Sequence, residues 1–255
     1  MLGIIGGSGL GKLVGLEGSQ RKVARTPWGQ PSSALTFGRL GGQPVVFIAR
    51  HGYGHTIAPH DINYQANIWA LREAGATALV ACTVVGGIRA DLQPGTLVVP
   101  DQIIDYTWGR KASYFSGVDQ PVVHVDFSEP YDEGVRGALL EAARAAGQAV
   151  VADGCYGCTQ GPRLETVAEV RRYERDGCDM LGLTAMPEAA LARELDLPYA
   201  ALAVVTNRAA GKDGTAAGTR ELSQIGRTLE TVMPRLLAVL TETAGQLARS
   251  RTQAG

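Results

Sequence analysis

The sequence predicts an α/β fold in which helices flank a β-sheet. Short unbroken apolar runs at Leu2–Ile5, Leu79–Cys82 and Ala201–Val205 are bounded by glycine or polar residues. Such runs are typical of strands that are buried on both faces of a sheet. Stretches with helical spacing of apolar residues lie between them, as at Pro59–Ala74 and Gly134–Ala146. Buried strands that alternate with amphipathic helices favour the α/β class.

The composition is that of an ordinary globular protein. Of the 255 residues, 45% are hydrophobic and 19% are charged, and the net charge of −1 gives no reason to expect a nucleic acid or an acidic membrane as partner. The first residues lack the basic start and long apolar core of a signal peptide, and no apolar run approaches membrane length. Four cysteines without such a signal favour a reducing compartment. With no repeat and no linker, we expect a single cytoplasmic domain over residues 1–255.

The remaining elements are expected from the same patterns, in chain order. They are β-hairpins over 20–48, strand and loop over 96–106, a long loop rich in aromatic residues over 107–134, a helix that follows 161–166 and runs through Arg172, a helix from Pro187 to Leu195, a loop at Lys212–Gly218, and a closing amphipathic helix from Glu221 to about Leu247. Long loops often carry function, so the segment 107–134 and the loop before the closing helix are of interest.

A glycine-rich turn follows the first strand. Residues 6–12 read Gly-Gly-Ser-Gly-Leu-Gly-Lys, in which backbone N–H groups and the Ser8 hydroxyl can approach an anion closely. The segment nearly matches a P-loop, but Leu13 stands where Mg²⁺ needs a hydroxyl. It also fails as a dinucleotide fingerprint, because Lys12 replaces the third glycine. A site for inorganic phosphate or a phosphate ester and a plain turn are the two favoured interpretations.

Two further strand ends carry groups that suit an anion. The run Val45–Ala49 leads into Arg50 and His51, and arginine is the side chain best suited to forked phosphate binding. Another strand ends in Thr83 and Val84, a hydroxyl beside a small residue. Ligands of open α/β sheets bind beyond the carboxyl ends of the strands. These three strand ends therefore predict one shared anion site, and the Thr184 hydroxyl at a later junction is a further candidate.

Metal binding is weakly supported. His51, His55 and His60 lie close together in the sequence, but only Asp61 follows as a carboxylate and the helical spacing of zinc ligands is missing. The pair Cys155-x-x-Cys158 lacks a second pair of ligands. We therefore expect no metal.

Three polar residues leave their role open from the residues alone. Asn207 follows the buried run Ala201–Val205, where an amide could read a heterocycle edge that carries both a donor and an acceptor, or could simply turn the chain before Gly211. Glu165, near the start of a helix, could merely complement the helix dipole. His124 is expected on an otherwise apolar strand, where a structural role is the alternative to a ligand contact.

Several motifs in the same order resemble the trimeric nucleoside phosphorylases. They cover nearly the whole chain: Gly-Ile-Ile-Gly-Gly-Ser-Gly-Leu at 3–10, Ala-Arg-His-Gly-x-x-His at 49–55, Asn-Tyr-Gln-Ala-Asn-Ile-Trp-Ala-Leu at 63–71, Gly-Pro-Arg-x-Glu-Thr at 161–166 and Met-Pro-Glu at 186–188. The resemblance implies a single-domain mixed β-sheet, partly barrel-like and flanked by helices. It also implies phosphorolysis of an N-glycosidic bond, which yields a free purine and a ribose 1-phosphate.

The resemblance assigns roles residue by residue. The phosphate contacts of the family match Ser8, Arg50, His51, Thr83 with Val84, and Thr184. His124 matches a histidine that a neighbouring subunit places over the 5′-methylthio group, which implies a homotrimer or a dimer of trimers, and His55 matches a histidine near the 5′ side. Inorganic phosphate is then a co-substrate, and no metal or organic cofactor is needed.

The base pocket is where this sequence departs from the methylthioadenosine phosphorylases. Glu165, Asn207 and Ala209 stand where those enzymes have Ser and two Asp, and the Glu–Asn pair is that of the 6-oxopurine phosphorylases. A carboxylate can accept from N1–H of hypoxanthine, whereas N1 of adenine is itself an acceptor. Leu164 and Leu183 replace Phe and Met of relatives, which alters the pocket beside the base and the ribose.

The expected reaction is therefore phosphorolysis of S-methyl-5′-thioinosine. Arg50 and the hydroxyls would hold phosphate, and Asn207 with Glu165 would stabilise the departing purine. Methylthioadenosine and inosine or guanosine are the alternative substrates within the family, and a P-loop nucleotide hydrolase and a purine-binding module without catalysis are the alternatives outside it.

Overall fold

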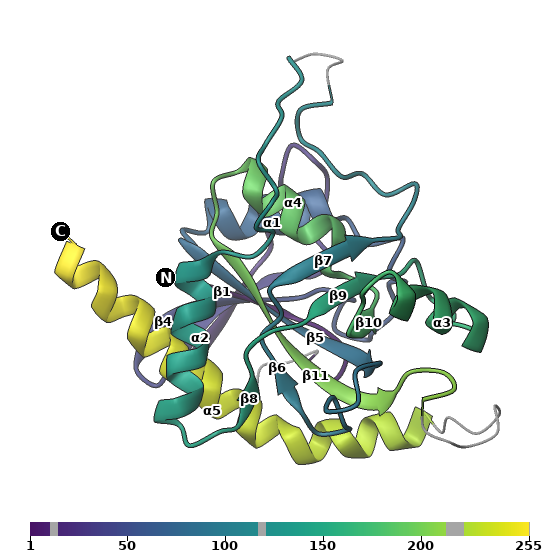
Figure 1. Cartoon of the computed structure of the whole chain (residues 1–255). Coiled ribbons are helices and arrows are strands. Elements are labelled where there is room, and N and C mark those ends of the chain that lie inside the picture. Colours follow the sequence, from purple (N-terminus) through teal and green to yellow (C-terminus); the bar gives the residue numbers. More distant parts are fainter. Residues whose placement is uncertain (11–14, 117–120, 213–221, 255) are drawn as a thin grey trace.

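The core of the molecule is a set of parallel strands at the centre of a mixed sheet (Figure 1). In the computed structural model, which describes residues 1–10, 15–116, 121–212 and 222–254, β1 (Leu2–Gly6) pairs in parallel with β4 (Gln43–Ala49) and with β5 (Ala78–Gly87). On its other side, β5 pairs in parallel with β11 (Tyr199–Arg208). The predicted α/β class and mixed sheet are confirmed.

The other strands extend this centre on both sides. They are β2 (Glu17–Lys22), β3 (Leu35–Leu40), β6 (Leu97–Val98), β7 (Gln102–Asp105), β8 (Val150–Val151), β9 (Cys155–Cys158) and β10 (Met180–Gly182). The predicted hairpins are β2–β3 and β3–β4, which pair antiparallel. The sheet branches at β5, because β5 continues past β1 and its last residues, Gly86 and Gly87, pair with β10.

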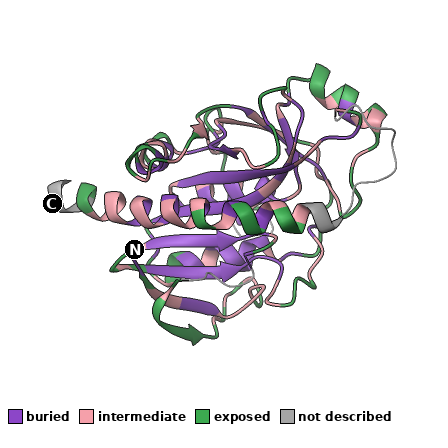
Figure 2. Ribbon diagram, turned by 90° about the horizontal axis from the view of Figure 1, so that it is seen from below, coloured by how far each residue is buried: buried purple, intermediate pink, exposed green. Residues whose placement is uncertain are grey.

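Helices cover both faces of the sheet, which explains why its central strands are mostly apolar and buried (Figure 2). Alternate residues of β11 enter two different cores: Ala201, Ala203 and Val205 pack with α1 (Tyr64–Glu73) and α4 (Ala185–Glu194). Leu202 and Val204 pack with α2 (Glu133–Ala145) and α5 (Leu222–Ala254). The fifth described helix, α3 (Val167–Arg175), packs through Val170 against a third, smaller cluster.

Two local predictions differ from the structure, and a third agrees with it. Helix α1 begins at Tyr64 and not at Pro59, because the Asn63 side chain caps it by accepting from the Ala66 N–H at 3.1 Å. His124 lies on no strand; it is exposed on an irregular segment without a pairing neighbour. Glu165 lies near the start of a helix as predicted, one residue before Thr166, which caps α3.

The described residues also provide evidence on a membrane-spanning helix and on a P-loop. Within the ranges given above, none of the helices is long and apolar enough to cross a membrane. Lys12 and Leu13, at the end of the segment that nearly matches a P-loop, lie outside the described residues. Gly15 and Leu16 lead into strand β2 and not into the helix that a P-loop requires.

Candidate active site

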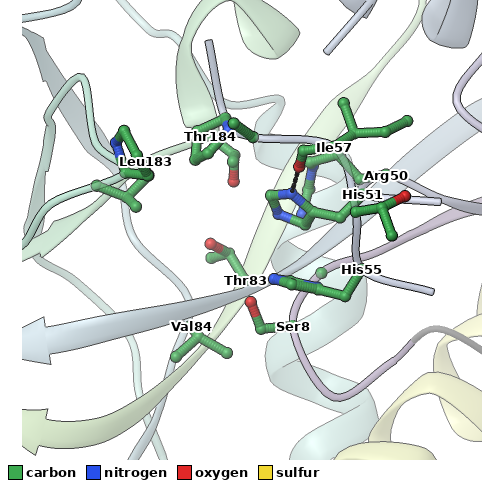
Figure 3. Close-up of a pocket in the computed structure, with 14 residues that line it drawn as sticks. Ser8, Arg50, His51, His55, Ile57, Thr83, Val84, Leu183 and Thr184 are labelled. Atoms are coloured by element: carbon green, nitrogen blue, oxygen red, sulfur yellow. Dashed lines mark hydrogen bonds between the residues drawn. The ribbon is translucent and has the colours of Figure 1, made fainter. Parts of the chain in front are cut away.

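A cavity of about 350 Å³ opens where β1 and β4 end beside the middle of β5 (Figure 3). Its wall brings together residues from five separate parts of the chain: Gly7, Ser8, Arg50, His51, His55, Thr56, Ile57, Ala58, Pro59, Thr83, Val84, Pro162, Leu183 and Thr184. Every residue predicted to contact phosphate is in this set. Thr83 lies within β5, not at its end, but Ile5 pairs with Ala81, so Thr83 is level with the turn after β1.

The turn after β1 requires glycine at position 7, because a side chain there would clash with its neighbours. A Cβ atom on Gly7 would lie 2.7 Å from the Cys82 carbonyl oxygen and 2.9 Å from Nη1 of Arg50. The next glycine, Gly9, has a φ of +79°, which disfavours other residues. Absence of a side chain lets the turn carry Ser8 close to Arg50 at the cavity wall.

Arg50 is fully buried and is held by a carboxylate that the sequence analysis left without a role. Its Nη2 donates to Oε2 of Glu188 at 2.9 Å, its Nε donates to Oε1, and its Nη1 donates to the Cys82 carbonyl at 3.2 Å. Tyr199 donates to the same carboxylate at 3.1 Å. Burial alone lowers the pKa of Arg50, but Glu188 outweighs it and raises this pKa above its ordinary value. The guanidinium therefore stays charged and fixed in one orientation.

His51 is neutral at pH 7 and has a defined tautomer. Its Nδ1 lies 2.9 Å from the Ile57 carbonyl oxygen, and a carbonyl only accepts, so Nδ1 carries a hydrogen. Burial, followed by the positive charge of Arg50, lowers the pKa of His51 to about 4. The ring of His55 lies against it, with the two centroids 4.4 Å apart. This pair lies on the side of the cavity opposite Leu183 (Figure 3).

Thr83 of the cavity wall contacts a tyrosine that the sequence analysis did not single out. Thr83 Oγ1 and Tyr156 Oη are 3.2 Å apart. Tyr156 is fully buried, and Gly182 makes room for it, since a Cβ there would lie 1.9 Å from Oη. Thr184 is the first residue before α4, yet its side chain makes no capping hydrogen bond.

Of the residues predicted to contact the base and the ribose, Leu183 lines this cavity, whereas Leu164, Glu165, Asn207 and Ala209 are not part of its wall. Thr159 donates to Oε1 of Glu165 at 2.6 Å, so a buried hydroxyl orients the carboxylate. A Cβ on Gly211 would lie 2.9 Å from Val167, and Ala209 packs in one cluster with Val170. The end of β11 therefore packs against the start of α3, which brings the segments of Glu165 and Asn207 toward each other.

Asn207 sits directly after a β-bulge. The pairing of β11 with β5 shifts between Val205 and Asn207, so Thr206 is an extra residue. The Asn207 amide accepts from the Thr206 hydroxyl at 3.1 Å and donates to the Arg208 carbonyl at 2.8 Å. Each bond uses one of its two lone pairs or hydrogens, so the amide retains one donor and one acceptor. A Cβ on Gly86 would lie 3.4 Å from Nδ2, so this glycine leaves space for the amide.

The other predicted residues lie as follows. Leu183 lines the cavity, Leu164 is 42% exposed, and Ala209 is buried. His124 is exposed and does not reach this cavity within one chain. The loop at Lys212–Gly218 falls almost entirely outside the described residues.

The residues suspected of metal binding do not assemble. His60 is exposed beside Asp61 and is not part of the cavity wall. Cys155 and Cys158 stand three apart on strand β9, so their side chains leave opposite faces of the sheet. In the part of the chain that the structure describes, no group of three or more His, Cys, Asp or Glu could hold a metal ion.

Comparisons with known proteins agree with this arrangement. A probable S-methyl-5′-thioinosine phosphorylase of Pseudomonas syringae pv. tomato is 51% identical over 87% of this chain and 90% of its own length. The 6-oxopurine nucleoside phosphorylase of Pyrococcus furiosus is 45% identical over 84% and 81%. Methylthioadenosine phosphorylase of Schistosoma mansoni, solved with adenine, superposes with a TM-score of 0.88 at 32% identity, over 97% of this chain and 92% of that one.

The family resemblance inferred from the motifs is confirmed by these matches. The family described as the phosphorylase superfamily matches residues 1–244, which include the cavity wall, Glu165 and Asn207. The chain belongs to the phosphorylase superfamily.

Proposed function

We propose that the protein is a purine nucleoside phosphorylase that cleaves S-methyl-5′-thioinosine with inorganic phosphate. The observation that carries the proposal is the cavity wall that combines Ser8, Arg50, Thr83 and Thr184. The carboxylate of Glu165, which Thr159 orients, follows Pro162 of the same wall by three residues in the chain. Three hydroxyls and a buried cation suit a phosphate, and the carboxylate of Glu165 would accept from an N–H of a base.

The phosphate end prepares the nucleophile. Arg50 supplies a positive charge fixed by Glu188, and the hydroxyls donate to phosphate oxygens, which would hold one of them beneath the anomeric carbon. The bond from that oxygen to C1′ forms as the bond from C1′ to N9 of the purine breaks. The ribosyl group between them carries positive charge in the transition state, and the departing purine takes the electron pair.

The base end stabilises that electron pair. Asn207 would donate to O6 and interact with N7, where negative charge gathers, and Glu165 would accept from N1–H. The purine takes up one proton to leave as neutral hypoxanthine, and 5-methylthioribose 1-phosphate is the other product. Phosphate is a substrate in this scheme, and every step is carried by side chains of the protein without a metal or an organic cofactor.

The 6-oxo preference follows from the polarity of the N1 position. Hypoxanthine presents a donor to Glu165, while adenine would present a lone pair to a carboxylate lone pair. A buried site that is built for one hydrogen-bond pattern rejects the mismatched base strongly. Relatives near 50% identity carry the thioinosine name, which supports this choice, although a protein from Bradyrhizobium diazoefficiens that is 44% identical is named for methylthioadenosine.

A three-substrate comparison tests the function. We expect phosphate-dependent release of hypoxanthine from methylthioinosine to exceed release of adenine from methylthioadenosine by at least about 100-fold in kcat/KM, because of the N1 mismatch. Inosine is assayed beside them, and reactions without phosphate are the control. Equal rates with the two methylthio substrates would contradict the proposed role of Glu165, and a faster reaction with inosine would make the protein an ordinary inosine phosphorylase.

The 5′ end of the substrate would be completed by a second copy of this chain. His124 is exposed, and its neighbours Val122 and Val123 are exposed apolar residues, as is Trp108 at 72%. An assembly of three copies, alone or as a pair of trimers, would cover this apolar surface and bring His124 over a neighbouring cavity. A cytoplasmic location completes the proposal, and all four cysteines are free thiols.

Substitution His124→Ala tests this contact. We expect KM for methylthioinosine to rise about tenfold, since one buried contact to the methylthio end is lost, while KM for phosphate changes little. Inosine, which lacks the methylthio group, serves as the matched substrate and should be affected less. A loss confined to phosphate would place His124 in a different part of the site, and sedimentation of the variant reports whether the assembly is intact.

A further inference from the structure

One arginine outside the cavity wall joins the two loops that border the site. Arg110 lies on the irregular segment after β7, and its Nη1 donates to the carbonyl oxygens of Leu183 at 2.8 Å and Met186 at 2.5 Å. Its Nη2 donates to the carbonyl oxygen of Gln160 at 2.9 Å and, more weakly, to that of Thr159 at 3.4 Å. A single guanidinium thus contacts both loops through four backbone carbonyls.

These carbonyls belong to the backbone that carries the proposed contacts. Leu183 and Met186 flank Thr184, whose hydroxyl lines the phosphate end of the cavity. Thr159 orients Glu165, and Gln160 begins the loop that leads to it. The distance between the Thr184 loop and the Glu165 loop is therefore set in part by the width of one planar group.

A third wall of the cavity connects to the same arginine. Nη1 of Arg110 lies 3.2 Å from the Tyr64 hydroxyl, which donates to the carbonyl of Pro59 at 2.7 Å, and Pro59 lines the cavity. The guanidinium also lies over the Tyr64 ring, 5.5 Å from its centroid. Among the described residues no carboxylate forms an ion pair with Arg110, so carbonyls and a hydroxyl supply the contacts of its guanidinium.

We propose that Arg110 is a positioning residue that fixes the spacing between bound phosphate and the purine. The role rests on the proposed phosphorylase function, because the two ends of the site must hold their groups in line for the displacement. Misplacement by about 1 Å lowers such a reaction about 100-fold. Lysine cannot replace the arginine here, since its point charge lacks the fixed fork that reaches carbonyls on both loops.

The test compares Arg110→Ala and Arg110→Lys with Arg136→Ala. Arg136 is a matched control: it is buried and donates to the carbonyls of Pro100 and Ala152, but it lies on α2 away from the cavity. For both Arg110 variants we expect kcat on methylthioinosine to fall about 100-fold with a smaller change in either KM. Guanidinium ion at millimolar concentration should restore part of kcat to Arg110→Ala. Arg136→Ala should be less stable to urea but keep the wild-type kcat.

Hydrogen exchange of the same variants separates this role from the function itself. In Arg110→Ala, peptides that cover 159–166 and 183–188 should lose protection together, and in Arg136→Ala they should not. An inactive wild-type enzyme would overturn the proposed function without touching this result. Unchanged exchange in both loops, a wild-type kcat in Arg110→Ala, or full activity in Arg110→Lys would overturn the positioning role.

Discussion

Replacing Glu188 with glutamine should lower the free energy of unfolding by about 3–5 kcal/mol and remove phosphorolysis. The variant leaves the guanidinium of Arg50 buried without a countercharge, and breaking one partner of a buried ion pair costs this much. Both side chains are almost completely buried, at 1% and 0% exposure, so water cannot compensate. Urea unfolding followed by circular dichroism measures the stability, and hypoxanthine release measures the activity.

A double variant separates the two effects. Arg50→Met with Glu188→Leu removes both charges, so much of the lost stability should return, because an apolar pair of similar size is often as stable as a buried ion pair. Activity should remain absent, since the variant lacks the guanidinium that is proposed to bind phosphate. Arg172→Met is the control, because its pair with Asp176 is 3.7 Å long and largely exposed and should matter by less than about 1 kcal/mol. An active double variant would show that Arg50 does not serve phosphate.

The second large effect is expected in the choice of base. Glu165→Gln keeps the shape of the side chain but removes the charge that is proposed to accept from N1–H. Hydrogen bonds to charged groups contribute about 1.5–3 kcal/mol, so the ratio of kcat/KM for methylthioinosine over methylthioadenosine should fall about 10- to 100-fold. Thr159→Val removes the hydroxyl that orients Glu165 and should shift the ratio in the same direction by less.

A reciprocal change should favour adenine. Asn207→Asp with Ala209→Asp restores the pair of acids found in methylthioadenosine phosphorylases and should raise the relative rate with the 6-amino substrate. Ala209 is buried in an apolar cluster with Val170, so a carboxylate there also lowers the stability, which urea unfolding will report. An unchanged substrate ratio in a folded variant would locate base selectivity elsewhere in the site.

The parts of the fold that the sequence predicted are those that local patterns determine. The run Ala201–Val205 is apolar at every position because helices cover both of its faces, and the structure places it inside β11. Ser8 and Arg50 follow strands that pair in parallel, so their meeting in one cavity follows from the strand order. Helix α1 was predicted too early because its periodicity extends past the cap at Asn63.

The rest depends on partners that are distant in the sequence. Glu188 is 138 residues from Arg50, and Tyr156 is 73 residues from Thr83, so no local pattern links either pair. Tyr156 also lies inside Cys155-x-x-Cys158, a spacing that by itself indicates cysteine chemistry and not a tyrosine contact. Arg110 lies in a segment without periodicity, and its contacts are backbone carbonyls, which any residue can offer.

The bulge at Thr206 determines on which face of β11 the Asn207 side chain lies. Side chains along a strand alternate between its two faces. The one extra residue therefore moves each later side chain of β11 to the face opposite the one that it would occupy without the bulge. In a strand one residue shorter, the same amide would lie on the opposite face of the sheet. It could still donate and accept hydrogen bonds, but it could not reach the purine. A one-residue insertion or deletion in this strand should therefore abolish recognition of the purine by Asn207 more completely than most substitutions.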